Sequence, residues 1–134
     1  MPHFIVEYSA NVETSSDIQA LCEAIRKSAL ATGVFESGGI RVRAYPARHF
    51  TIADAHERNA FLHLQLRVGA GRSVEKIKEA GERIFETIRD FLEPELAEPY
   101  FGLSFEIVEI HPELSWKANS IHPRLRGQVK GDQK

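Results

Sequence analysis

A strand–helix–strand pattern runs through this chain twice, and the duplication limits the folds that are open to it. The two copies span residues of about 2–58 and 60–122, with Phe4 of the first corresponding to Leu62 of the second. A strand joined through a helix to a second strand favours a right-handed crossover and parallel pairing. We therefore expect an α+β fold of duplicated β-α-β units, with a four-stranded sheet and two helices on one face.

The first copy is defined by alternation and by helix signals. Apolar and polar residues alternate over 3–9, which is typical of a strand. Ser16 stands three residues before Gln19, the spacing of a capping box at the start of a helix. Apolar residues then recur at helical intervals until Gly33, a suitable stop. A second alternating stretch, residues 40–45, predicts the strand that completes the unit.

The second copy repeats these signals in the same order. Residues 60–68 alternate as a strand, and a glycine-rich turn follows. Ser73 is a suitable N-cap for a long helix, which Pro94 closes. Residues 101–110 supply the fourth strand. The sequence thus predicts a strand, a helix and a strand in each half of the chain.

Length and composition bound the domain organisation. A chain of 134 residues with 43% hydrophobic and 27% charged residues is typical of one globular domain. We assign this single domain to residues 1–126. The remaining residues, 127–134, form a short polar tail that we expect to be disordered.

Charge, hydropathy and cysteine content exclude several classes of function. The formal net charge of −2 argues against nucleic acid as a partner, because phosphate binding needs a basic excess. No apolar run approaches the roughly 18 residues that cross a bilayer, and no secretory leader is visible, so no membrane partner is expected. The single cysteine, Cys22, excludes an intrachain disulfide and suits a reducing cytoplasm.

The sequence predicts neither a metal site nor a bound cofactor. One cysteine cannot build a multi-cysteine zinc or iron–sulfur centre, and Cys22 falls in an apolar helical stripe, where it is expected to be buried and inert. The six histidines do not show the HExxH spacing or a similar chelating pattern. They are His3, His49, His56, His63, His111 and His122.

Apolar residues on both faces of the strands predict an oligomer. Phe4, Ile5 and Val6 follow one another, although two helices can cover only one face of the sheet. Large exposed apolar patches usually mark an interface. The stretch 111–122, which contains Leu114 and Trp116, is expected to be an arm that packs on a neighbouring subunit.

The residues that could carry chemistry lie at the ends of the predicted strands. Removal of Met1 would expose the secondary amine of Pro2 at the head of the first strand. Arg41 and Arg43 share one face of the second strand by the period-two rule. Arg72 follows a glycine-rich turn at a helix start, where anions bind readily. Taken alone, each arginine is more simply interpreted as a solvated surface charge, and many unrelated proteins have proline at the second position.

Five stretches in the same order link the chain to a known family. The chain resembles the 5-carboxymethyl-2-hydroxymuconate delta-isomerase family of the tautomerase superfamily up to about residue 122. The matching stretches are Pro2–Ser9, Gly39–Arg41, Gly69–Ser73, Leu103–Ile107 and His111-Pro112. No single stretch is specific, but their combination is.

The resemblance implies a cofactor-independent isomerase that is a homotrimer, with Pro2 as catalytic base. It implies that Arg41 and Arg72 contribute to catalysis and bind the carboxylates of a small polycarboxylate substrate; Arg43 has a counterpart with a less defined binding role. The implied reaction moves a proton from the 2-hydroxyl of 5-carboxymethyl-2-hydroxymuconate to C5, giving the 2-oxo-3-ene isomer. This step belongs to homoprotocatechuate (4-hydroxyphenylacetate) degradation.

Two other functions stay open at this point. The same N-terminal proline serves other activities of the superfamily, such as an enol–keto tautomerase, a decarboxylase or a dehalogenase. A non-catalytic oligomeric binding module with the same fold is the alternative from a different class. It predicts that Met1 is retained or that Pro2 is dispensable.

Overall fold

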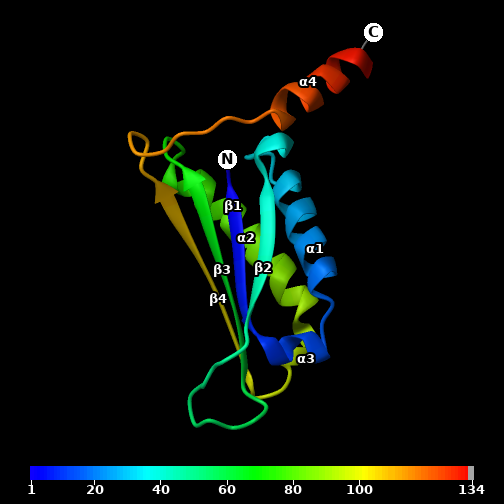
Figure 1. Cartoon of the computed structure of the whole chain (residues 1–134), viewed down its shortest axis with the longest axis vertical. Coiled ribbons are helices and arrows are strands. Elements are labelled where there is room, and N and C mark those ends of the chain that lie inside the picture. Colours follow the sequence, from blue (N-terminus) through cyan, green and yellow to red (C-terminus); the bar gives the residue numbers. More distant parts are fainter. Residues whose placement is uncertain (133–134) are drawn as a thin grey trace.

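A single mixed sheet organises the molecule (Figure 1). The computed structural model describes residues 1–132 of the 134-residue chain. The strand order is β2-β1-β3-β4. The strands are β1 (His3–Ser9), β2 (Arg41–Ala47), β3 (Ala60–Gly69) and β4 (Phe101–Ile110).

Two long helices cover one face of this sheet (Figure 1). They are α1 (Ile18–Ala31) and α2 (Val74–Phe91). Shorter elements complete the chain: the 3-10 helices η1 (Ala10–Thr14) and η2 (Ser37–Gly39), and the helices α3 (Glu93–Leu96) and α4 (Ile121–Asp132). The predicted four-stranded sheet with two helices on one face is confirmed.

The strand pairing reproduces the duplication. β1 pairs with β2 in parallel, and β3 pairs with β4 in parallel, so each half is a β-α-β unit. The two units meet through the antiparallel pair β1–β3, in which Phe4 lies opposite Leu66. This arrangement places His3, at the head of β1, beside Arg41 and Arg67.

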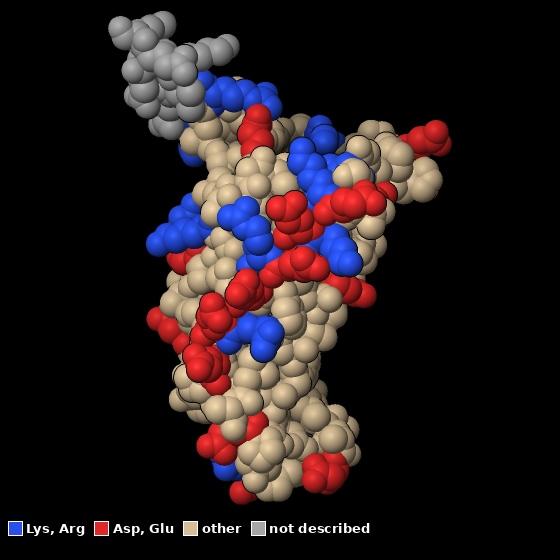
Figure 2. Space-filling model, turned by 180° about the vertical axis from the view of Figure 1, so that it is seen from behind, with Lys and Arg blue, Asp and Glu red and all other residues tan. Residues whose placement is uncertain are grey.

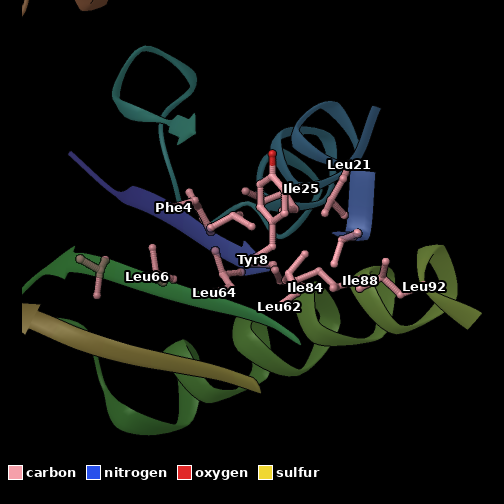
Figure 3. Packing of buried hydrophobic residues seen from close by; sticks show 14 of the residues in the cluster. Phe4, Tyr8, Leu21, Ile25, Leu62, Leu64, Leu66, Ile84, Ile88 and Leu92 are labelled. Carbon is pink, nitrogen blue, oxygen red and sulfur yellow. The ribbon is translucent and has the colours of Figure 1, made fainter. Parts of the chain in front are cut away.

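The core lies between the sheet and the two long helices (Figure 3). The alternation in β1 and β3 turns every second side chain toward α1 and α2, where these side chains are buried. Fully buried members include Phe4, Leu21, Ile25, Leu62, Leu64, Leu66, Ile84, Ile88 and Leu92. This packing fixes the orientation of β1, and with it the position of the N-terminal residues.

The helix starts confirm one predicted cap and correct the other. Ser73 accepts a hydrogen bond from the N–H of Lys76 at 3.2 Å and caps α2 as expected. The cap of α1 is Asp17, which accepts from the N–H of Ala20 at 3.0 Å, so the prediction of Ser16 was wrong. Ser16 Oγ instead donates to Glu95 at 2.7 Å, a long-range contact that removes it from the cap.

The uncovered face of the sheet is more polar than the sequence suggested. Ile5 and Val108 are apolar, but they alternate or pair with charged and amide side chains. Arg43, Gln65 and Glu106 lie on this face, and Gln65 donates to Glu106 at 3.1 Å. The face is therefore mixed in polarity, because the strand residues that point away from the helices are largely hydrophilic.

The C-terminal helix α4 packs beside η2. It runs from Ile121 to Asp132, and the disorder expected from residue 127 stays a prediction. Its first turns are anchored by Arg126, which donates to Glu36 at 2.6–3.0 Å. A contact between residues so far apart in the chain gives no local sequence signal. Residues 133–134 of the predicted tail lie outside the described residues.

Acidic and basic side chains are intermixed on the side of the molecule shown in Figure 2. This arrangement accords with the nearly balanced composition, 17 Lys and Arg against 19 Asp and Glu. Within residues 1–132, the helices are all too short or too polar to cross a bilayer.

Candidate active site at the N-terminal end of β1

Pro2 is buried at the head of β1, against the turn that leads into β2. Its carbonyl accepts a hydrogen bond from the N–H of Arg41 at 3.2 Å, which extends the parallel pairing by one residue. A Cβ at Gly39 would lie only 3.3 Å from Pro2 Cδ. Glycine at position 39 therefore allows the η2 backbone to approach the proline ring, and Pro2 is held rigidly.

The N-terminal amine lies in a positively charged environment. Met1 carries this amine, and burial lowers its pKa below the usual value. The positive charges of Lys117, Arg72 and Arg41 lower the pKa further, as does a hydrogen bond from Lys117. Both effects disfavour the protonated amine. With Met1 in place, the nitrogen of Pro2 is a peptide nitrogen without basicity.

Arg41 and Arg72 approach the terminus from opposite halves of the chain and are held by backbone carbonyls. Arg41 Nη1 donates to the carbonyls of Gly38 and Gly39 at 3.3 and 2.9 Å. Arg72 donates from Nη1 to Gly69 at 3.3 Å and from Nη2 to Val34 at 3.4 Å. A guanidinium has five N–H donors, so each side chain keeps donors for a carboxylate.

The ring of Phe35 adds a further contact to Arg72. The guanidinium carbon lies 5.5 Å from the ring centroid, within the range of a cation–π interaction. Phe35 itself is buried and packs edge-on against Phe4. The position of Arg72 is thus set by the core rather than by the solvent.

Arg43 faces a different partner. Its Nη1 lies 3.0 Å from Nδ1 of His3. Arginine can only donate, so His3 Nδ1 accepts, and the imidazole is neutral. Burial and the charges of Arg43 and Arg41 lower the pKa of His3, with Arg67 contributing as well. Arg43 thus lies beside the site and is occupied by His3, whereas Arg41 and Arg72 act on the amine.

A cavity of about 250 Å³ opens beside the N-terminal residue. Its walls come from the start of β1, the turn after β3 and the segment that follows β4. They are Met1, His3, Gly69, Ala70, Ile110, His111, Pro112, Ser115, Trp116 and Lys117. Pro2, Arg41 and Arg72 do not line it in this form of the chain, in which Met1 does.

The segment 111–122 lines the cavity of its own chain. It was expected to pack on a neighbouring subunit, but Trp116 and Lys117 line the cavity beside Met1. Leu114 and Trp116 are nevertheless 68% and 84% exposed, so packing on a neighbour stays a prediction. A lone tryptophan suits a pocket wall as well as an interface, but the local sequence pattern does not indicate where the segment folds.

Cys22 lies in α1, where it lines a second cavity together with Arg41 and Arg43. It is half-buried rather than fully buried, and burial together with Glu23 raises the pKa of its thiol. The thiol is therefore protonated and unreactive at neutral pH, as expected. Within residues 1–132, three or more His, Cys, Asp or Glu side chains do not gather closely enough to hold a metal ion.

The fold defines the class of protein. The structure of a fused 4-OT symmetric trimer superposes with a TM-score of 0.66 at 16% identity, covering 87% of this chain and 93% of the other. A duplicated β-α-β sheet of this kind, with helices on one face, is thus a fold that the two proteins share.

The sequence then identifies the family. A sequence model of the 5-carboxymethyl-2-hydroxymuconate isomerase family matches residues 2–125, and the chain belongs to this family. The 5-carboxymethyl-2-hydroxymuconate Delta-isomerase of Escherichia coli is 39% identical over 122 residues, covering 91% of this chain and 97% of that protein. The crystal structure of a 5-carboxymethyl-2-hydroxymuconate isomerase from Deinococcus radiodurans R1 has a TM-score of 0.88 at 38% identity, covering 93% and 94%.

Proposed function

We propose that this chain isomerises 5-carboxymethyl-2-hydroxymuconate, or a close relative, to the 2-oxo-3-ene isomer without a cofactor. The observation that carries the proposal is the group of cations around the start of β1 in a member of this family. Two guanidinium groups and Lys117 gather beside a partly buried amine and a cavity. Such a group favours a polyanionic substrate and disfavours a protonated base.

The base in this proposal is Pro2 after removal of Met1. An ordinary α-amine has a pKa of about 7.7–8.0, and a prolyl amine is intrinsically more basic. The burial and the charges that lower the pKa of the Met1 amine act one residue away from the Pro2 nitrogen. They would keep the secondary amine unprotonated near neutral pH, as a general base requires.

The reaction needs one group that accepts and returns a proton. The Pro2 nitrogen takes the proton from the 2-hydroxyl, and the electron pair of that O–H bond enters the conjugated system as a dienolate. The ammonium of Pro2 then delivers the proton to C5, which forms a C–H bond and leaves a 2-oxo-3-ene. The amine is regenerated, so acid and base roles fall to the same atom.

Arg41 and Arg72 bind the carboxylates and stabilise the charge that develops. Planar guanidinium groups form paired hydrogen bonds with carboxylates. Negative charge grows on the C2 oxygen during the transfer, and a fixed cation beside it favours the transition state over the ground state. Arg43, held by His3, contributes to substrate binding through its positive charge.

The assembly and setting of the enzyme form part of the proposal. We propose a homotrimer in the cytoplasm, acting in the degradation of homoprotocatechuate. The mixed uncovered face of the sheet and the exposed Leu114 and Trp116 provide surface for subunit contacts.

The choice of substrate is tested by comparing two enols. The purified, Met1-free protein is expected to give a kcat/KM for the tricarboxylate dienol at least about 100-fold above that for phenylenolpyruvate, because the monoacid can engage only one guanidinium. Ketonisation is followed by ultraviolet absorbance. Equal or better turnover of the monoacid would instead assign another tautomerase activity, and turnover of neither would favour the binding module.

The pH dependence of kcat/KM reports the state of the base. Because only the unprotonated amine accepts a proton, kcat/KM is expected to rise with pH and level off above the pKa of Pro2. Cations that lower the pKa move the midpoint of this rise to lower pH. In Arg72→Ala the midpoint is therefore expected to move to higher pH. An unchanged midpoint would remove Arg72 from the environment of the base.

A further inference from the structure

The start of α4 is tied to η2 by one amide side chain. Asn119 Oδ1 accepts hydrogen bonds from the N–H groups of Ile121 at 2.8 Å and His122 at 3.3 Å, and thereby caps α4. Asn119 Nδ2 donates to the carbonyl of Gly38 at 2.9 Å. The same side chain therefore begins the helix and binds the turn that precedes β2.

Glu36, immediately before η2, provides the second connection. Arg126 donates to both carboxylate oxygens of Glu36 at 2.6–3.0 Å, and His122 Nδ1 lies 2.6 Å from Oε2. The hydrogen bond from Arg126 holds the pKa of Glu36 below its usual value, so the carboxylate is charged. Exposed ion pairs add little stability, but the paired contact of Arg126 with both carboxylate oxygens of Glu36 defines the orientation of α4 on η2.

The fit between α4 and η2 leaves no room for a side chain at Gly38 and little room at Gly39. A Cβ at Gly38 would lie 2.7 Å from His122 Nδ1 and 3.0 Å from His122 Cα. A Cβ at Gly39 would meet the His122 ring at 3.4 Å from one side and Pro2 Cδ at 3.3 Å from the other. The first turn of α4 thus packs directly on the backbone that contacts Pro2 (Figure 1).

The contact between α4 and η2 is linked to Arg41 through one shared atom. The carbonyl oxygen of Gly38 accepts from both Asn119 Nδ2 and Arg41 Nη1, and Gly39 provides the second acceptor for Arg41. A carbonyl fixed on one side by Asn119 fixes the guanidinium on its other side. Catalytic geometry is sensitive to such placement, since a shift of about 1 Å can cost on the order of 100-fold in rate.

We propose that Glu36, Gly38, Asn119, His122 and Arg126 form an α4 clamp that positions Arg41 for a carboxylate of the substrate. These are positioning residues, because they act through η2 and Arg41. The inference rests on the proposed function, and it assigns a catalytic purpose to a helix that lies largely beyond the residues matched by the family.

A double-mutant cycle tests the clamp in the Met1-free protein. Asn119→Ala is expected to lower kcat/KM about ten-fold, mainly by raising KM, because the bound carboxylate loses an aligned partner. In an Arg41→Ala background the same change is expected to cost less than about two-fold, since residues that act as a unit are not additive. Equal fold losses in the two backgrounds, or no loss in either, would overturn the proposal.

Further variants separate positioning from loss of folding. Glu36→Gln keeps the shape of an exposed side chain and is expected to show the same dependence on Arg41. Gly38→Ala forces α4 away from η2 and is expected to match or exceed the effect of Asn119→Ala. The matched control is Gly127→Ala in α4, where a Cβ meets nothing within 4 Å and activity is expected to be unchanged.

Two measurements test the clamp independently of turnover. In Asn119→Ala, the amides of Gly39, Ile40 and Arg41 are expected to exchange with solvent at least about ten-fold faster, because η2 loses its support. The Kd for propane-1,2,3-tricarboxylate is expected to rise in an Arg41-dependent manner. If the wild type binds this probe but does not turn over the dienol, the proposed function is wrong. The exchange rates and the Kd values still test the clamp in that case. Unchanged exchange and unchanged Kd would refute the clamp.

Discussion

Adding one alanine before Pro2 is expected to lower kcat/KM by about 1,000-fold. After removal of Met1, the added residue would turn the Pro2 nitrogen into a peptide nitrogen, as Met1 does in the structure. It would also displace the free amine by one residue from its place at the head of β1. A positioned general base contributes about 100- to 10,000-fold, and this variant removes it without changing another side chain.

The matched variant for this experiment is Pro2→Ala. It leaves a primary amine at the first position of the mature chain, so part of the activity is expected to remain. Intact-mass measurement of each protein shows whether Met1 has been removed. Full activity in a protein whose mass includes Met1 would exclude Pro2 as the base. It would also turn attention to Lys117, the other amine at the terminus.

Replacing Arg72 by alanine is expected to lower kcat/KM about 100- to 1,000-fold, the cost of removing one donor aimed at developing charge. The guanidinium is held by the carbonyls of Gly69 and Val34 and lies over Phe35, so its position is fixed before substrate arrives. The loss in kcat/KM has two sources: weaker binding of a substrate carboxylate and a higher pKa of Pro2. Steady-state kinetics at several pH values separate them.

The oligomeric state provides the control for the Arg72→Ala variant. Sedimentation of Arg72→Ala is expected to match the wild type, and Arg89→Ala, at an exposed arginine in the last turn of α2, is expected to keep wild-type activity. Arg72→Lys keeps the charge but not the planar fork, so it is expected to recover the pH midpoint better than the KM. If Arg72→Ala dissociated the oligomer, the side chain would have a structural role instead.

The sequence predicted the framework of the fold because strands and helices have local signals. Alternation in β1 and β3, the helical spacing in α2 and the cap at Ser73 all appear within a few residues of one another, and the structure has each of them. The duplication then gave the sheet, since two β-α-β units can join through their first strands. The prediction of the α1 cap was wrong for the opposite reason: Ser16 bonds to Glu95, which is 79 residues away.

The candidate site shows the same division. The positions of Arg41 and Arg72 near the head of β1 follow from strand order and from the turn before α2. The contribution of Lys117 does not, because it depends on the path of the segment after β4 across the N-terminus. The carbonyls that accept hydrogen bonds from each guanidinium could not be predicted either, because every residue has a backbone carbonyl and no residue type marks the ones that are used.

The amino-acid sequence alone predicted the duplicated sheet, the family and the candidate reactive side chains, because periodicity and short motifs are properties of neighbouring residues. Only the tertiary structure decided that α4 packs on η2 and that Asn119 and Arg41 share the carbonyl of Gly38. The contacts of Asn119 with Gly38 and of Arg126 with Glu36 join residues about 80 or more positions apart, and their geometry exists only once the sheet and its helices have packed.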